Sequence, residues 1–216
     1  KLGITVITMH SDSVHGTFHD IALLGKATGK TAEAAALTES MQKRIDAVTE
    51  KLKGVTTTPT AFHCVWADPL WVSGGQTFQD EIISLAGGTN PFQDVNGWGI
   101  ITMERLLTTD PEMIIVDSGM GMGQGGYDVL KDYFYTEPRL QSLAAVKNKQ
   151  VYVMNADIID RGGPRIVDCL EELAQIIHPE VFGERTQATP AQGAPGFPVI
   201  AALAVVCAAV LLIRRP

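Results

Sequence analysis

The chain has 216 residues, a formal net charge of −7 and a pI of about 5.2. That length suits one domain or one and a half. The acidic balance argues against a nucleic-acid surface, because no basic stripe is present to neutralise phosphates. The three cysteines, Cys64, Cys169 and Cys207, are odd in number and lack metal-site spacing, so we expect no disulfide framework.

The first thirty residues predict a strand and a short helix. Residues 4–9 form an apolar, β-branched run typical of a buried strand, and residues 17–24 read as helix after a polar turn. A strand at the very start suggests that the chain begins in the middle of a domain. We therefore expect a fragment that lacks an N-terminal part.

Residues 31–53 predict one long uninterrupted helix. The segment contains no Gly or Pro and consists mostly of strong helix formers. An apolar face recurs at steps of four, four, three and four residues, formed by Leu37, Met41, Ile45, Val48 and Leu52. The helix would be about 33 Å long. It could be a surface helix on a sheet or a strut between two bodies.

Strands alternate with helices over the next 130 residues or so. The predicted strands span residues 61–66, 113–117 and 151–154. The predicted helices span residues 77–85, 103–107, 127–135 and 165–177, with a helical turn at 140–144. Residues 67–75 and 90–102 are predicted to be loops. This alternation indicates an α/β fold with a largely parallel sheet.

The C-terminal residues predict a linker and a membrane anchor. Residues 183–194 are polar, small and Pro-containing, as in a linker. Residues 199–213 form an apolar run, about 22 Å long as a helix and short for a bilayer core of roughly 30 Å. Arg214 and Arg215 follow it, so we expect a cytoplasmic end and an extracellular globular part. The preceding Pro-Gly-Phe resembles the sorting signal of archaeal surface proteins, whose tails are cut and exchanged for a lipid; a plain membrane span is the other interpretation.

A glycine-rich stretch, SGMGMGQGG at residues 118–126, follows one predicted strand and precedes a helix. Its GMGQGG spacing fits a dinucleotide-binding turn, which would make the protein a nucleotide-dependent enzyme. So many glycines produce such a match by default, and a flexible loop is the favoured interpretation. Neither Ser73 nor Ser118 lies in a G-x-S-x-G motif, and we expect no catalytic residues and no cofactor.

Three histidines near the start suggest a metal-ion receptor as a further alternative. His10, His15 and His19 lie near Asp12 and Asp20, and imidazole and carboxylate are suitable ligands for zinc or iron. No Cys or Glu completes the set. A polar turn at a strand end is therefore the favoured interpretation.

Three tryptophans fall at strand ends or in Gly/Pro-rich loops rather than in a core periodicity: Trp66, Trp71 and Trp98. Open α/β sheets bind their ligands at the loop edge of the sheet. Each indole could be ordinary half-buried packing. Together they favour a cleft for a large, flat ligand with apolar faces.

The segment NADIIDRGGPR supplies polar groups at the same edge, because it follows the last predicted strand. Asp157, Asp160 and Arg161 could orient a ligand, or they could form an internal Asp–Arg pair. Arg165 is better placed to serve the start of the next helix.

Four segments of the sequence together resemble a known family: LGKATGKTAEAAAL, WVSGGQTFQDEIISLAGGTNPF, WGIITMERLLTTDPEMIIV and VKNKQVYVMNADIIDRGGPRIVDCLEELAQIIHPEVF. On these segments, residues 3–181 are identified as a member of the substrate-binding proteins of cobalamin and iron-siderophore ABC importers. The resemblance implies two α/β lobes joined by a rigid helix. It further implies a remnant of the first lobe at 1–30, the interlobe helix at 31–53, the second lobe at 54–182, a linker at 183–194 and the anchor at 195–216.

The resemblance also implies roles for particular residues. Trp98 matches a position that lines the cleft, and Asp157 and Arg161 match positions that contact cobalamin. Trp66 and Trp71 lie on the neighbouring loop. Glu104 matches the acidic residue with which this lobe docks on the permease, although a Glu there also suits the helix dipole.

The sequence thus predicts an extracellular, surface-anchored substrate-binding component of an ABC importer. Its ligand would be a corrinoid, a ferric siderophore or a haem-like chelate, so the metal would arrive with the ligand. Its protein partners would be the permease and its ATPase, with no nucleic acid.

Overall fold

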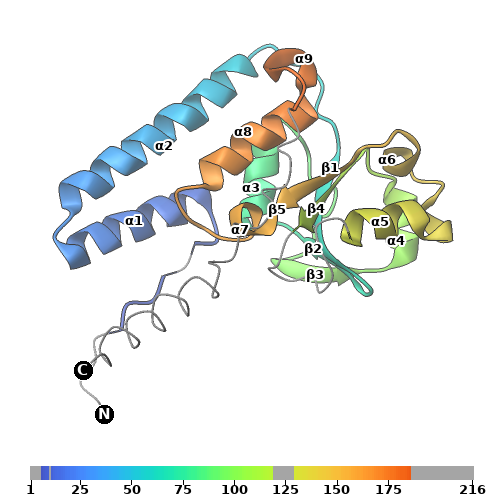
Figure 1. The fold of residues 1–216 in the computed structure, drawn as a ribbon, viewed down its shortest axis with the longest axis horizontal. Helices are drawn as coiled ribbons and strands as arrows, with labels where there is room; N and C mark the ends of the chain where they lie inside the picture. The colour runs from blue at the N-terminus through green and yellow to red at the C-terminus, as the bar shows by residue number, and fades with distance from the viewer. Residues whose placement is uncertain (1–5, 10, 119–128, 186–216) are drawn as a thin grey trace, which may run out of the picture. The chain divides into compact units, whose positions relative to one another are not determined.

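The computed structural model describes residues 6–9, 11–118 and 129–185, and their elements are labelled in Figure 1. The helices are α1 Val14–Thr28, α2 Thr31–Lys51, α3 Phe78–Leu85, α4 Met103–Thr109, α5 Val129–Thr136, α6 Ala144–Lys147, α7 Ala156–Ile159, α8 Ile166–Ile177 and α9 Pro179–Phe182, with a 3₁₀ turn η1 at Pro138–Leu140. The strands are β1 Ala61–Ala67, β2 Leu70–Ser73, β3 Trp98–Ile101, β4 Met113–Ser118 and β5 Val151–Asn155.

The strands form a five-stranded sheet in the order β3-β2-β1-β4-β5. β1, β4 and β5 pair in parallel, whereas β2 is antiparallel to both β1 and β3. Four of the five strands therefore run in one direction. This arrangement confirms the predicted α/β fold with a largely parallel sheet.

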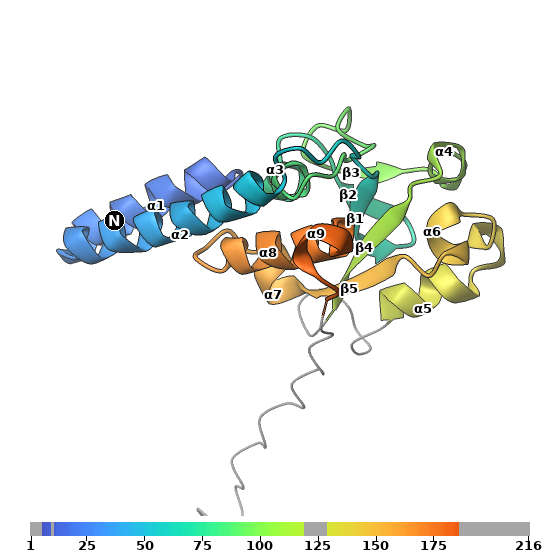
Figure 2. The same cartoon turned by 90° about the horizontal axis from the view of Figure 1, so that it is seen from above.

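Helices cover both faces of the sheet (Figure 2). One apolar core lies between the sheet and α2, α3 and α8, and it contains Ile115 and Met154. The other apolar core lies between the opposite face of the sheet and α4, α5 and α6, and it contains Phe62, Ile114 and Val116. Side chains of successive strand residues alternate between these two cores, as a pleated strand requires.

The long helix α2 confirms the prediction of an uninterrupted helix, although it ends at Lys51 rather than at residue 53. Met41, Ile45 and Val48 are buried on its apolar face, whereas the Leu37 side chain is 39% exposed. α2 packs on α1, α3 and α8, and its Arg44 forms ion pairs with α8. Its role as a strut between two lobes, and the other domain boundaries, remain predictions.

Three local predictions were wrong. The strand predicted at residues 4–9 is absent from its described part, residues 6–9, which pairs with no edge of the described sheet. Residues 67–75 contain β2 and residues 90–102 contain β3, which pair with each other in register from Leu70 to Ser73. Each has only four residues beside turn-forming residues, too few for a clear alternation pattern.

Three predicted segments lie wholly or mostly outside the described residues: the glycine-rich stretch from residue 119 onward, the linker from residue 186 onward, and the anchor at 195–216 with its apolar run 199–213. Within 6–9, 11–118 and 129–185, none of the helices has both the length and the apolar character needed to cross a bilayer.

Candidate functional site

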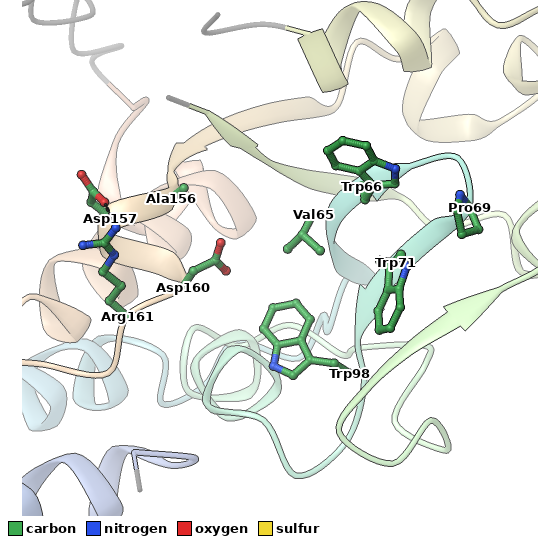
Figure 3. A pocket seen from close by; sticks show the side chains of 9 residues that line it. All are labelled: Val65, Trp66, Pro69, Trp71, Trp98, Ala156, Asp157, Asp160 and Arg161. Atoms are coloured by element: carbon green, nitrogen blue, oxygen red, sulfur yellow. Dashed lines mark ion pairs between the residues drawn. The ribbon is translucent and has the colours of Figure 1, made fainter. Parts of the chain in front are cut away.

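A pocket of about 660 Å³ opens at the edge of the sheet where β1 and β5 end. Figure 3 shows the indoles on one side, Asp157 and Arg161 on the other, and Asp160 between them. The structure thus brings together all five residues predicted to bind ligand. The complete lining is Val65, Trp66, Pro69, Trp71, Trp98, Ala156, Asp157, Asp160 and Arg161.

A β-bulge directs Trp66 into this pocket. Cys64 lies opposite Val72 and points into the core, but the next register pair joins Trp66 to Trp71. One extra residue on β1 thus shifts the alternation, so that Trp66 shares the face of Trp71 rather than that of Cys64. The Trp66 indole Nε1 donates a hydrogen bond to the Asp68 carbonyl oxygen at 2.9 Å. The two indoles remain 42% and 38% exposed.

Two glycines set the position of Trp98, which is 41% exposed. Gly74 and Gly75 hydrogen-bond with Gly97 through their backbones at 2.8 Å. A Cβ atom on Gly74 would lie 2.1 Å from the Val95 carbonyl oxygen. Only glycine allows this close approach of two backbones, and the approach places Trp98 at the start of β3.

The polar wall of the pocket comes from α7 and the residues after it. Arg161 and Asp157 form an i, i+4 ion pair at 2.9 Å, and both side chains are more than half exposed. Arg165 is the N-cap residue of α8 and donates to the Asp157 carbonyl oxygen at 3.0 Å. The internal Asp–Arg pair therefore exists, and its charges still face the pocket.

Below the pocket lies a group that we call the His–Asp cluster: His63, Asp117 and Asp160. His63 on β1 is fully buried, and its Nε2 lies 2.7 Å from Asp117 Oδ1 on β4. Asp160 Oδ1, at the end of α7, lies 3.9 Å from the same nitrogen. Ser73 Oγ lies 3.4 Å from the other ring nitrogen, Nδ1.

Burial and charge act against each other in this cluster. Burial disfavours the His63 cation, but the neighbouring Asp117 outweighs it and raises the His63 pKa. Burial alone would raise the Asp117 pKa; attraction to His63 and hydrogen bonds lower it instead. Burial and then Asp117 raise the Asp160 pKa to about 7. Near neutral pH Asp160 is therefore partly protonated and hydrogen-bonds with Asp117.

The sequence analysis missed His63 and Asp117, and only Asp160 was singled out. The available signal was a histidine inside the apolar strand AFHCVW and an aspartate ending the apolar strand MIIVDS. Polar residues in fully buried strands need a partner, but the sequence does not say which one.

The other predicted sites lie away from the pocket. Glu104 is exposed in the first turn of α4, where hydrogen bonds from its own backbone N–H and from Thr102 lower its pKa. His15 and His19 are exposed on α1, and His10 lies outside the described residues. Within the described part of the chain, the His–Asp cluster is the one group of three or more residues of metal-ligand type.

Comparisons with known proteins place this geometry in a family. Residues 1–158 match the sequence profile of the family described as periplasmic binding protein. The chain is 30% identical over 186 residues to the uncharacterized ABC transporter substrate-binding lipoprotein YvrC of Bacillus subtilis (strain 168), covering 84% of this chain and 56% of that protein. It is 26% identical over 234 residues to the cobalamin-binding protein of Halobacterium salinarum, covering 99% of this chain and 62% of that protein. This chain belongs to the periplasmic binding protein family, which confirms the family predicted from the sequence.

The fold agrees with this assignment. A possible iron-binding (periplasmic solute-binding) protein from Staphylococcus epidermidis superposes with a TM-score of 0.70 at 22% identity, covering 82% of this chain and 67% of that structure. The chain spans 56% and 62% of the length of the two curated relatives. Members of this family are substrate-binding proteins of transport systems that work outside the cytoplasmic membrane.

Proposed function

We propose that this chain supplies the ligand-binding lobe of an ABC importer's substrate-binding protein, and that its ligand is a metal chelate: a corrinoid, a ferric siderophore or a haem-like macrocycle. The observation that carries the proposal is the pocket itself. Three exposed indoles face an exposed Asp–Arg pair across a pocket with a volume of about 660 Å³. The names of the relatives, one of them cobalamin-binding, agree with this ligand class.

The tryptophans would supply most of the affinity. A buried indole removes about 150–250 Å² from water, equivalent to about 4–6 kcal/mol gross at about 25 cal/mol/Å². One charge-assisted hydrogen bond contributes about 1.5–3 kcal/mol. A flat, apolar-faced ligand would therefore be held by Trp66, Trp71 and Trp98, while Asp157 and Arg161 fix its orientation through its polar edge.

Binding, rather than chemistry, is the task that this pocket suits. Its lining offers aromatic faces and an ion pair, without a nucleophile hydrogen-bonded to a base. The metal of the chelate would arrive within the ligand, so chelate binding itself requires no resident cofactor. We therefore propose that the protein is not an enzyme.

The protein partners in this proposal are an ABC permease and its ATPase. Glu104 is exposed at the start of α4, where an arginine of the permease could reach it. The apolar run 199–213 would anchor the protein to the membrane through its C-terminus, either as a span or after exchange for a lipid. The ligand-binding lobe would then work at the outer cell surface.

The test is a titration of the 216-residue chain with cobalamin, with haem and with a ferric siderophore. Quenching of tryptophan fluorescence reports binding, because all three tryptophans line the pocket. Free N-acetyltryptophanamide corrects for light absorbed by the ligands, and equilibrium dialysis measures the affinity directly. The proposal requires saturable binding of at least one of the three; no binding of any would refute it.

A further inference from the structure

The His–Asp cluster has the composition and the spacing of a metal-binding site. His63, Asp117 and Asp160 each offer one ligand atom, and the three atoms lie within 4.8 Å of one another. They come from three separate elements, β1, β4 and the end of α7, so the fold itself brings them together. One imidazole nitrogen with two carboxylate oxygens is a donor set typical of zinc and similar divalent ions.

Buried oxygens in and beside the cluster are a second observation that favours a bound cation. Asp117 Oδ2 is buried and has no hydrogen-bond donor apart from the proton that Asp160 can carry, and the Asp117 side chain is only 6% exposed. The amide oxygen of Gln79 is also buried and has no donor among the described residues, and the Gln79 amide nitrogen lies 3.4 Å from Asp160 Oδ1. Buried oxygens are normally satisfied. A divalent cation would balance both carboxylates in place of the protons on His63 and Asp160.

The surroundings of His63 resemble those of a metal-binding histidine. A ligating imidazole usually donates its other N–H to an oxygen, which fixes the ring. Here Nδ1 lies 3.4 Å from Ser73 Oγ, and the Ser73 backbone oxygen accepts from Asn90 Nδ2 at 3.0 Å. The opposite nitrogen, Nε2, faces the two carboxylates.

The distances suit a small adjustment on binding. Ligand atoms about 2.0–2.2 Å from a tetrahedral zinc lie about 3.4 Å apart. The observed separations from His63 Nε2, 2.7 Å to Asp117 and 3.9 Å to Asp160, lie on either side of that value. Side-chain shifts of less than about 1 Å would therefore create the site.

We propose that His63, Asp117 and Asp160 bind a divalent cation of the zinc type at the floor of the pocket. The proton on His63 Nε2 and the proton that Asp160 partly carries are both released to solvent when the ion binds. Asp160, 18% exposed, is the ligand that also lines the pocket, so the remaining coordination position faces the pocket. That position takes water or an oxygen donor of a small ligand. The inference does not depend on chelate binding, since the site needs only the ion.

The test uses Co²⁺ as a spectroscopic probe of the 216-residue chain and Zn²⁺ in equilibrium dialysis. We expect one ion per chain and visible Co²⁺ absorption of the intensity typical of four- or five-coordinate sites. Asp160→Asn keeps the side-chain volume and should weaken binding at least tenfold, since even residues that only support metal ligands affect affinity by that much. Asp68→Asn is the matched control, because Asp68 is an exposed carboxylate next to Pro69 that neither lines the pocket nor belongs to the cluster; the ion affinity of this variant should stay within twofold of wild type.

Two further variants keep the result interpretable. His15→Asn/His19→Asn removes the exposed histidines of α1 and should not change the stoichiometry. Asp117→Asn should also abolish binding if circular dichroism shows that it folds. The proposal is overturned if the wild-type chain binds no ion stoichiometrically, which would mean that shared protons satisfy the cluster, or if Asp160→Asn binds as tightly as wild type. Chelate binding, measured separately by dialysis, can fail or succeed without affecting either outcome.

Discussion

The indole of Trp98 packs edge-on against the imidazole of His63, with ring centroids 5.8 Å apart and an interplanar angle of 71°. This contact joins the exposed wall of the pocket to His63, the fully buried member of the His–Asp cluster. An aromatic pair of this geometry contributes about 0.5–1.5 kcal/mol beyond the area that it buries. The His63 ring therefore supports the Trp98 indole from below, and a ligand would meet a pre-positioned ring.

The first prediction concerns that ring. Trp98→Ala should weaken binding of the preferred chelate about 10- to 100-fold, or about 1.4–2.8 kcal/mol, because it removes a seated aromatic face. Trp98→Phe should lose less affinity, since a phenyl ring keeps part of the aromatic face. Equilibrium dialysis measures both. The control is Ile100→Ala on the same strand, since Ile100 is 54% exposed and does not line the pocket; equal losses in the two alanine variants would count against the proposed site.

Arg161 should matter for the ligand and not for the fold. Its ion pair with Asp157 is exposed, and exposed pairs typically contribute about 0–1 kcal/mol to stability. We expect Arg161→Ala to weaken chelate binding about 5- to 20-fold, because a ligand in the pocket loses a charge-assisted hydrogen bond. Urea unfolding should barely change. Arg139→Ala breaks a comparable pair with Glu137 away from the pocket and should leave the affinity at the wild-type value.

The fold was predictable where a single segment carries its own signal. β1, β4 and β5 are continuous apolar runs, and α2 has a 3.6-residue period over 21 residues. β2 and β3 are short, and their stability comes from pairing with each other and with β1. Pairing between strands is not visible in either segment alone, which is why both were assigned to loops.

The candidate site was predictable to a similar extent. Trp66, Trp71 and Trp98 could be assigned to one edge because the ends of parallel strands meet there. The bulge that turns Trp66 to that face could not, since it depends on the register with β2. His63 lies opposite Ile115 in the parallel pairing of β1 and β4, so it reaches Asp117 diagonally, and this contact between residues 54 apart in the chain depends on the strand register.

Breaking the buried pair should cost far more stability than breaking an exposed one. His63→Ala leaves Asp117 as an uncompensated buried carboxylate, for which we expect a loss of about 3–5 kcal/mol in urea unfolding with EDTA present. His63→Leu/Asp117→Asn removes both charges and should recover part of that loss. A double variant no more stable than the alanine variant would show that packing, and not charge, sets the cost.

Gly74→Ala tests how the glycines seat Trp98. Its new Cβ atom would lie 2.1 Å from the Val95 carbonyl oxygen, so the segment leading to Trp98 must move. We expect a loss of about 2 kcal/mol or more in stability, together with weaker chelate binding. Gly163→Ala is the matched change, because a Cβ there meets nothing within 4 Å. If the two variants behave alike, the close approach at Gly74 is not what positions the indole.

The last prediction returns to the long helix α2. Arg44 donates to Glu171 through two nitrogens, at 2.8 and 2.7 Å, and to Asp168 at 2.6 Å, which joins α2 to α8. Hydrogen bonds to Glu171 raise the Arg44 pKa, as expected for a guanidinium held by two carboxylates. Because Arg44 is 37% exposed, solvent screening limits its contribution, and we expect Arg44→Met to cost about 1–2 kcal/mol. Lys43→Met, which breaks the exposed i, i+4 pair with Glu39, should cost less than about 0.5 kcal/mol. Equal effects in urea unfolding would mean that α2 is held to α8 by its apolar face alone.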